Sequence, residues 1–226
     1  MTKNIVTRID AAVPIKNLLV SVSDKTGLDD FIPRLMEVSP PAHIYSTGGT
    51  FAAIRQALGE GAKNRLTPVA AYTGQPETQG GLVKTLDFKI YLGLLTEAYN
   101  DAHAADMQRT GAVYIDMVVV NLYPFTRTID RQGVTPEEAR ANIDIGGPCM
   151  LRAAAKNFLR VAPVVDPGDY PRLLDEMAAG QGTLSLDTRY ELATKAFEHT
   201  AGYDRAIADY LAATPLDQVQ SCYQLT

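Results

Sequence analysis

The sequence predicts an α/β protein in which a parallel β-sheet is covered by helices. Short apolar runs alternate with amphipathic helical stretches through the first half of the 226-residue chain. Twice, an apolar run leads through a turn of small polar residues into a helical stretch. The apolar run at residues 117–120 is unbroken, as expected of a central strand that is buried on both faces.

The first two strand–turn–helix units lie near the N-terminus. Residues 18–22 (LLVSV) predict a buried strand, and apolar residues then recur from Leu28 at the i, i+3, i+4 and i+7 spacing of one helix face. Residues 43–45 predict the second strand, and apolar residues at helical spacing follow from Phe51. Each unit has a polar turn between strand and helix: SDKTG at 23–27 in the first, and STGGT at 46–50 in the second.

The second half of the chain becomes increasingly helical. Thr135, followed by Pro at the first position and Glu at the third, has the pattern of a capped helix start, and another helix is expected from Pro148. Residues 161–165 predict a further strand. We expect one domain over residues 1–226, with a sheet core at about 17–170. We expect the helical part at about 171–226 to pack on the sheet or on a partner subunit.

Composition and charge narrow the class of protein. The net charge of −5 and the pI near 5.2 argue against a nucleic-acid groove. The absence of a long apolar run and of a secretion signal predicts a cytoplasmic protein without a membrane segment. Cys149 and Cys222 are too few for a disulfide framework and lack metal spacing. We interpret the scattered histidines His43, His103 and His199 as structural or exposed.

The two polar turns favour a phosphorylated ligand. In open parallel sheets, ligands bind at the carboxyl ends of the strands, where both turns and residues 121–125 are expected to lie. Helix N-termini, hydroxyl groups and a lysine are the groups that a phosphate monoester needs. The alternative is that both turns are plain helix caps. The spacing of a Walker-type phosphate loop is absent, so a P-loop nucleotidase is not supported.

Four further residues form a candidate catalytic set. Lys84 follows a glycine-rich stretch, Tyr123 ends a strand before proline, Asp144 lies in a Gly-flanked turn, and Lys156 ends a helix. Taken singly, each has an ordinary structural explanation: a surface lysine, a core aromatic, a turn aspartate or a helix C-terminal charge. Together they offer acids, bases and hydrogen-bond donors at the opening of one site.

Several motifs resemble one enzyme family. They are SVSDKTG at 21–27, STGGT at 46–50, VKTL at 83–86, NLYPF at 121–125 and NIDIGGPCMLRAAAKN at 142–157. In these motifs, and in LATKAFEHTA at 192–201, the sequence resembles the IMP cyclohydrolase half of the bifunctional AICAR transformylase/IMP cyclohydrolase. The motifs appear in family order from Leu19 to about Tyr210, so nearly the whole chain is covered.

The resemblance implies a methylglyoxal-synthase-like three-layer fold, with about five parallel strands and a C-terminal helical extension. It implies closure of the purine ring of FAICAR to IMP with loss of water, without metal or organic cofactor, in a homodimer. The transformylase half of the family is missing from the sequence, which ends at Thr226. The chain would then be a stand-alone cyclohydrolase beside a separate transformylase, or an excised domain.

By motif match, Lys84, Tyr123, Asp144 and Lys156 take the family's catalytic positions. The implied roles are orientation and deprotonation of the carboxamide by Asp144, which Lys156 holds, and polarisation of the carboxamide by Lys84. Tyr123 and backbone N–H groups would hold the developing oxyanion. The nucleotide would be bound by residues of the matched motifs: Ser23, Asp24, Lys25, Thr26, Thr47, Gly48, Gly49, Thr50, Thr85, Asn121, Ile145 and Gly146.

The chain departs from the family in one motif. Where the family reads Gly-Gly-Arg-Val-Lys-Thr-Leu-His-Pro, Leu82 replaces the arginine, and Asp87 and Phe88 replace His-Pro. The family arginine faces the phosphate, and losing such a charge-assisted contact costs roughly 1.5–3 kcal/mol. Asp87 adds a negative charge nearby. Either Lys63 or Arg65 compensates from elsewhere, or the ligand differs.

Two other functions remain open at this stage. One is a non-catalytic sensor of the same fold, which binds a purine nucleotide or another phosphorylated metabolite. The other is phosphate elimination from a triose phosphate. It is less favoured because the NIDIGG and AAAKN segments belong to the cyclohydrolase.

Overall fold

A computed structural model describes residues 5–75, 84–224 and 226. Within these residues, a parallel five-stranded sheet has the strand order β4-β3-β2-β5-β6. Its strands are β2 (Asn17–Val22), β3 (His43–Ser46), β4 (Leu66–Pro68), β5 (Met117–Asn121) and β6 (Ala162–Val164). The predicted α/β class and the parallel sheet of about five strands are confirmed.

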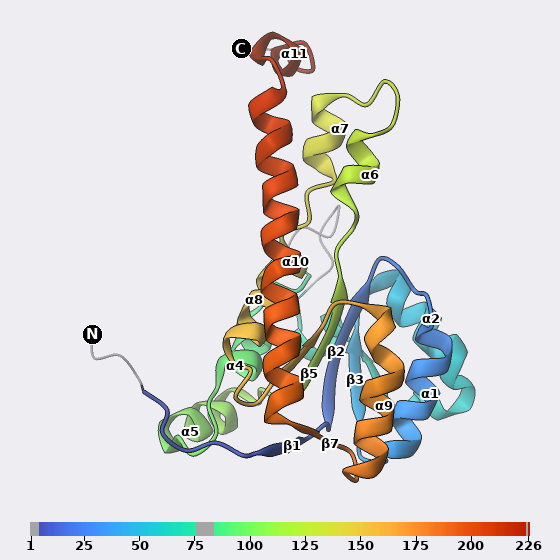
Figure 1. Cartoon of the computed structure of the whole chain (residues 1–226), viewed down its shortest axis with the longest axis vertical. Helices are drawn as coiled ribbons and strands as arrows, with labels where there is room; N and C mark the ends of the chain where they lie inside the picture. The colour runs from blue at the N-terminus through green and yellow to red at the C-terminus, as the bar shows by residue number, and fades with distance from the viewer. Residues whose placement is uncertain (1–4, 76–83, 225) are drawn as a thin grey trace.

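The central strand β2 is buried because its apolar side chains alternate between two cores. Leu18 and Val20 belong to one core and Leu19 to the other, and all three are fully buried. Helices cover both faces, which gives three layers (Figure 1). One face carries α1 (Leu28–Val38), α2 (Gly48–Leu58) and α9 (Tyr170–Ala179), and the other carries α4 (Phe88–Leu95), α8 (Gly146–Lys156) and α10 (Leu186–Ala213).

Shorter elements complete the described part of the chain. A small antiparallel sheet pairs β1 (Ala12–Pro14) with β7 (Thr183–Ser185). The remaining helices are η1 (Gly59–Asn64), α3 (Val69–Thr73), α5 (Asp101–Thr110), α6 (Phe125–Ile129), α7 (Pro136–Ala141), η3 (Pro167–Asp169) and α11 (Leu216–Gln220). The predicted Thr135 capping box begins α7. Within residues 5–75, 84–224 and 226, none of the helices combines the length and the apolar character needed to cross a bilayer.

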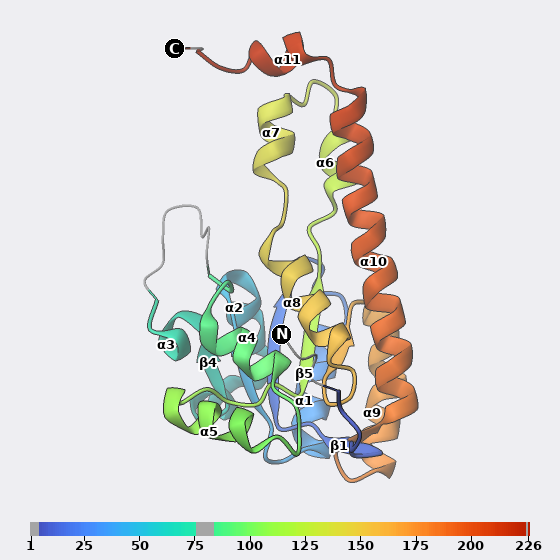
Figure 2. The ribbon, with the colours of Figure 1, turned by 90° about the vertical axis from the view of Figure 1, so that its left-hand side faces the viewer.

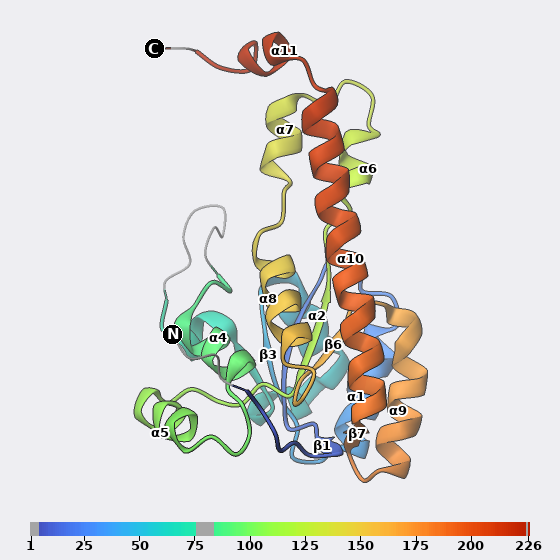
Figure 3. The same ribbon diagram turned by 60° about the vertical axis from the view of Figure 1, so that its left-hand side comes forward.

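The long helix α10 joins two parts of the molecule. Its N-terminal half packs on α8 and β6. Its C-terminal half extends beyond the sheet, with α6 and α7 beside it and α11 at its tip (Figures 2 and 3). The Tyr223 hydroxyl after α11 donates a hydrogen bond to Glu137 in α7.

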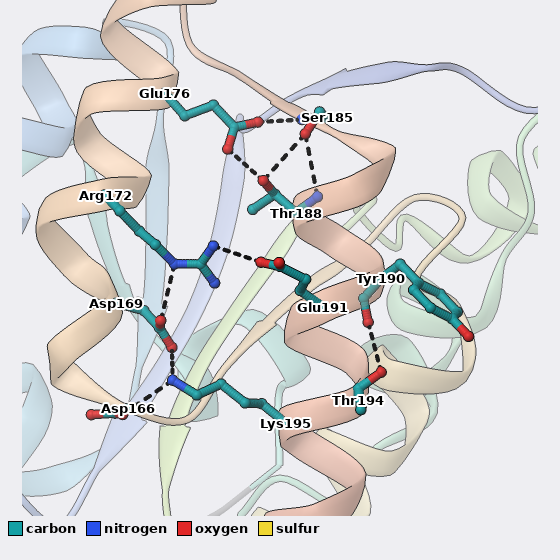
Figure 4. A network of polar contacts seen from close by, with 10 residues as sticks. All are labelled: Asp166, Asp169, Arg172, Glu176, Ser185, Thr188, Tyr190, Glu191, Thr194 and Lys195. Atoms are coloured by element: carbon teal, nitrogen blue, oxygen red, sulfur yellow. Dashed lines mark hydrogen bonds and ion pairs between the residues drawn. The ribbon is translucent and has the colours of Figure 1, made fainter.

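Charged side chains fix α10 against α9 and the loop that follows β6 (Figure 4). Lys195 in α10 lies 3.1 Å from Asp166 and 2.7 Å from the buried Asp169. Arg172 in α9 lies 3.0 Å from Asp169 and 2.7 Å from Glu191 in α10. Because Asp166 and Asp169 follow β6, this network sets the position of α10 at the carboxyl end of the sheet.

The end of α8 is anchored to the end of α4. The Asn157 side-chain amide donates to the carbonyl oxygens of Leu94 (2.7 Å) and Thr96 (3.0 Å). Arg160 donates to the Thr96 carbonyl at 3.1 Å and pairs with the buried Asp116 at 3.2 Å. The asparagine of the AAAKN motif therefore has a structural role in this fold.

Candidate functional site

Three cavities lie at the carboxyl edge of the parallel sheet. The inner cavity, of about 310 Å³, is lined by Thr47, Lys84, Thr85, Asp144, Ile145 and Gly146, among others. The side cavity, of about 190 Å³, is lined by Thr47, Gly48, Gln75 and Lys84, among others. Because Thr47 and Lys84 line both, these two cavities adjoin each other.

The third and largest, the outer cavity of about 1000 Å³, lies beside α10. Its lining includes Ser23, Asp24, Lys25, Thr26, Asn121 and Tyr123. Arg127, Asp166, Lys195, Glu198 and His199 also contribute to it. Ten of the twelve nucleotide-binding residues expected from the sequence therefore line one of the three cavities. The other two are Gly49 and Thr50.

Asp144 lies at the N-terminus of α8, where it lines the inner cavity. Its carboxylate accepts a hydrogen bond from the Gly147 N–H at 3.0 Å, so it caps the helix. Its own backbone N–H donates to the hydroxyl of Tyr203 in α10 at 2.7 Å. Both contacts restrict the aspartate to one place at the cavity wall.

The two glycines of the NIDIGG motif each permit a close approach. A Cβ atom at Gly146 would lie 2.4 Å from the Thr85 hydroxyl oxygen. At Gly147, a Cβ atom would lie 2.5 Å from Asp144 Oδ2 and 2.6 Å from a methyl carbon of Leu122. The motif therefore brings the chain around Thr85 and Asp144 together at the inner cavity.

The turn after β2 is shaped by two of the predicted binding residues. The Asn121 side-chain oxygen accepts the N–H groups of Ser23 (2.7 Å) and Asp24 (2.8 Å), and its nitrogen donates to the Asp24 carbonyl (2.8 Å). Asp24 in turn accepts the Thr26 N–H and hydroxyl, and these hydrogen bonds hold the pKa of Asp24 below its ordinary value. The side chains of Asn121 and Asp24 thus shape the loop.

Lys25 lies where the first turns of α1 and α2 meet. Its ammonium group is 3.4 Å from the Val22 carbonyl oxygen and 3.3 Å from that of Ser23. A Cβ atom at Gly49 would lie 3.9 Å from Lys25 Cε, so the lysine runs along the start of α2. The first N–H groups of α2, at Gly48 and Gly49, have no acceptor within the helix, as at every helix N-terminus. This corner combines a cation with backbone donors.

Thr47 and Thr50 are held by β2. The Thr47 hydroxyl lies 2.9 Å from that of Ser21. The buried Thr50 hydroxyl accepts the Val22 N–H and donates to the Val22 carbonyl, both at 3.0 Å. Thr50 therefore joins α2 to β2, while Thr47 remains at the cavity wall.

The structure brings together two of the four predicted catalytic residues. Lys84 and Asp144 line the inner cavity, whereas Tyr123, with 46% of its surface exposed, lines the outer cavity. Lys156 is exposed at the last residue of α8. An 11-residue helix is about 16 Å long, so Lys156 lies far from Asp144 in the same chain. The expected contact between Lys156 and Asp144 is not made within one chain.

Leu82 and Asp87 are two of the residues that depart from the family motif. Leu82 lies outside the described residues. Asp87 is buried and caps α4, where it accepts the Lys89 N–H and the Gln75 side-chain amide, both at 2.7 Å. Its charge is therefore directed at the α4 N-terminus and at Gln75.

Arg65 and Lys63 do not compensate for the missing arginine, which corrects one of the expectations above. The Arg65 guanidinium donates to the carbonyl oxygens of Pro40 (2.7 Å) and Ala42 (3.1 Å), just before β3. Lys63 lies in η1, the segment immediately before Arg65. Both residues therefore lie toward the amino ends of the strands, away from the cavities.

Arg127 and His199 are cavity residues that the sequence did not indicate. Arg127 in α6 lines the outer cavity with Lys25, and its charge contributes to the lowered pKa of Asp24 after the Thr26 hydrogen bonds. His199 in α10 lines the same cavity, and burial lowers its pKa. Arg127, four positions after Tyr123, belongs to no motif that would mark it as a binding residue. Among the described residues, no group of three or more His, Cys, Asp and Glu side chains is placed to hold a metal ion.

Two protein families match the sequence. Residues 27–149 match the family described as "MGS-like domain", and residues 154–226 match "AICARFT/IMPCHase bienzyme". A solved structure described as "Crystal structure of ForH" superimposes with a TM-score of 0.69 at 31% sequence identity, covering 85% of this chain and 96% of that one. These matches confirm the methylglyoxal-synthase-like fold expected from the motifs.

Curated relatives resemble nearly the whole chain. "Bifunctional purine biosynthesis protein PurH" of Chlorobium phaeovibrioides is 47% identical over 212 residues, which is 94% of this chain and 39% of that protein. The protein of the same name from Ruminiclostridium cellulolyticum is 48% identical over 200 residues, 88% of this chain and 37% of its own. The chain thus spans less than two fifths of the length of these relatives.

Proposed function

The chain belongs to the MGS-like domain family and matches the IMP cyclohydrolase part of the PurH proteins, and from this premise we propose that it closes the purine ring of FAICAR to give IMP and water. The observation that best supports the proposal is the placement of Lys84 and Asp144 in one cavity at the carboxyl edge of the sheet. A cation and a carboxylate at one cavity wall suit the activation of a carboxamide.

The proposed reaction forms one C–N bond and releases one oxygen as water. The carboxamide nitrogen of FAICAR attacks the carbon of the neighbouring formamido group and loses one proton. The formamido nitrogen loses a second proton as the C–O bond breaks and the ring C=N bond forms, and the oxygen leaves with both protons as water. The carboxamide nitrogen is a weak nucleophile, so the site has to align it and accept its proton. Asp144 accepts the proton, and Lys84 polarises the carboxamide.

Tyr123 is the proposed donor to the oxygen of the tetrahedral intermediate. It lies in the segment after β5, beside the outer cavity, and nearly half of its surface is exposed. A side chain with that exposure has room to rotate toward a ligand that fills both the inner and the outer cavity. An oxyanion donor of this kind acts through a hydrogen bond that strengthens as charge develops.

The phosphate group of the nucleotide is assigned to the corner around Lys25. The first turn of α2 contributes backbone N–H groups at Gly48 and Gly49, and Lys25 contributes a positive charge. Arg127 lies in the wall of the same outer cavity and adds a second positive charge. These groups are an alternative to the guanidinium that is missing at Leu82.

Lys156 takes part in this mechanism only if a second copy of the chain brings it to the cavity. Its predicted role and the predicted homodimer can therefore be tested together. If both hold, Asp144→Asn and Lys156→Ala are each inactive, and mixing them restores part of the turnover. Full turnover by Lys156→Ala would remove that residue from the site, and light scattering would report the oligomeric state separately.

The proposed function is tested by incubating the purified chain with FAICAR and following IMP formation by absorbance. Lys84→Met is the matched negative control, because it removes the charge and keeps a side chain of similar length. Binding of IMP by calorimetry without turnover by the wild type would favour a sensor. Binding of neither FAICAR nor IMP would contradict both functions. A separate transformylase that supplies FAICAR remains a prediction.

A further inference from the structure

Tyr203 in α10 contacts the loop that carries Asp144. The residue is 9% exposed, and its hydroxyl oxygen accepts the backbone N–H of Asp144 at 2.7 Å. Burial raises the pKa of Tyr203, so the phenol is neutral at physiological pH. The hydrogen bond is partly buried, and an N–H group shielded from water that loses its acceptor is costly, so this contact restrains the loop between α7 and α8.

The same side chain contacts the segment that carries Tyr123. The Tyr203 ring packs edge-on against Phe125, with 6.4 Å between ring centroids and 72° between the planes. Phe125 is buried and lies two residues after Tyr123. One tyrosine therefore contacts both the loop that carries Asp144 and the start of α6, two residues after Tyr123.

Tyr203 is itself held in place by the attachment of α10. Two turns earlier in the same helix, Lys195 pairs with Asp166 and Asp169, which follow β6 (Figure 4). The helix has no proline between Lys195 and Tyr203. The position of the Tyr203 hydroxyl is therefore set by the parallel sheet through a rigid helix.

We propose that Tyr203 is a positioning residue for ring closure, because its hydroxyl fixes Asp144 and its ring fixes the Tyr123 segment. The inference rests on the proposed cyclohydrolase function. Tyr203 lines neither the inner nor the outer cavity, so it acts through Asp144 rather than on the substrate. Near-attack geometry is sensitive to small displacements, so loosening the Asp144 loop should slow the chemical step more than it weakens binding.

The substitution Tyr203→Phe removes the hydroxyl and keeps the ring packing on Phe125. We expect kcat with FAICAR to fall by about 10- to 100-fold, the cost of a misplaced catalytic group, while KM changes by less than about twofold. Tyr210→Phe is the matched control. Tyr210 also packs edge-on against Phe125 from α10, at 5.7 Å between centroids, but Tyr203 is the residue that accepts the Asp144 N–H. Removing the Tyr210 hydroxyl should leave kcat and KM unchanged.

A second readout follows the hydrogen bond itself. Amide hydrogen exchange, measured by NMR on the wild type and both variants, should accelerate at Asp144 in Tyr203→Phe and stay unchanged in Tyr210→Phe. Wild-type turnover in Tyr203→Phe would overturn the proposal. An equal loss of kcat in both variants, with a parallel fall in thermal midpoint, would also overturn it, because the helix would then have only a structural effect.

Different results would contradict the proposed function and the role of Tyr203. A wild-type chain that makes no IMP refutes the proposed function and, with it, the catalytic role of Tyr203. Unchanged exchange at Asp144 in Tyr203→Phe refutes the positioning contact even if the wild type is an active cyclohydrolase.

Discussion

The backbone of Gly147 lies in direct contact with the carboxylate of Asp144. Its N–H donates to Oδ1 at 3.0 Å, and a Cβ atom on it would be 2.5 Å from Oδ2. Real Cβ atoms do not approach an oxygen this closely, so any other residue at this position displaces the carboxylate or the helix. The second glycine of the NIDIGG motif is explained by this contact.

Replacing Gly147 by alanine should therefore displace the Asp144 carboxylate from its place in the wall of the inner cavity. We expect kcat with FAICAR to fall by about 100-fold, as for a catalytic group displaced by about 1 Å. The free energy of unfolding should fall by about 1–3 kcal/mol because of overpacking against Leu122. Kinetics and urea denaturation would measure both. Gly61→Ala is the control, since a Cβ atom there meets nothing within 4 Å. Equal behaviour of the two variants would contradict the prediction.

Replacing Asp144 by asparagine should separate the role of this residue in capping α8 from its proposed role in accepting the carboxamide proton. The asparagine side-chain oxygen can still accept the Gly147 N–H, so the thermal midpoint should stay close to that of the wild type. The amide cannot accept a proton, and general-base catalysis is typically worth about 10²- to 10⁴-fold in rate. We expect a loss of kcat in that range with IMP affinity retained, measured by stopped-flow absorbance and calorimetry. A large loss of IMP affinity would instead assign Asp144 to binding.

Replacing Lys25 by glutamine should weaken nucleotide binding. A charge-assisted hydrogen bond contributes about 1.5–3 kcal/mol, so the Kd for IMP should rise by about 10- to 100-fold. The rise should shrink at high salt, because the lysine is near the surface. Lys63→Gln is the matched control, because η1 lies away from the cavities. Calorimetry on both variants tests this, and equal affinities would show that the phosphate does not lie beside Lys25.

Replacing Glu176 by glutamine tests the attachment of α9 to the start of α10. Burial alone would raise the pKa of Glu176, but hydrogen bonds from Thr188 (2.5 Å) and the Ser185 N–H (2.7 Å) lower it below its ordinary value of 4.5 (Figure 4). A lowered folded-state pKa contributes stability above about pH 4.5, and this stability is lost as the pH falls through the folded-state pKa.

The variant should accordingly be less stable than the wild type by about 1–2 kcal/mol at pH 7, with the difference shrinking below about pH 4.5. Urea denaturation at several pH values measures it. Glu191→Gln, which loses one exposed ion pair with Arg172, should change the stability by less than about 1 kcal/mol. A pH-independent difference for Glu176→Gln would contradict the assignment.

The sheet could be predicted from the sequence mainly where a strand lies in an apolar run or directly precedes a motif turn. β2, β3, β5 and β6 were predicted within a few residues. The missed strands β1, β4 and β7 have three residues each, too few to show a period-two pattern. β6 is equally short, but it lies within the apolar run at residues 161–165, which made it recognisable. The helix α4 was also missed. Its sequence, FKIYLGLL, is apolar on several sides and contains a glycine, so a helical stripe is hard to recognise.

The sequence predicted only part of the candidate site. Motifs give the identity of residues but not the distances between them. The family resemblance implied that Lys156 holds Asp144, but the 11-residue helix α8 separates the two residues within one chain. Asn121 was expected to bind the nucleotide; it lines the outer cavity, and its amide also shapes the turn after β2, a structural role that the motif did not indicate. Tyr203 belongs to a helical stripe that looks like ordinary core packing. A hydrogen bond to a backbone N–H from a distant loop leaves no signal in a single sequence.

The pairing of β1 with β7 has a consequence for how the chain folds. Ala12 lies opposite Ser185, so residues that are far apart in the sequence must meet before this small sheet can form. Contacts between distant residues lower the folding rate, because the entropy of closing a long loop is lost before the contact forms. Since α10 begins directly after β7, we expect this late closure to fix the start of the helix that delivers Tyr203. Activity in a refolding experiment should therefore appear after most of the secondary structure has formed.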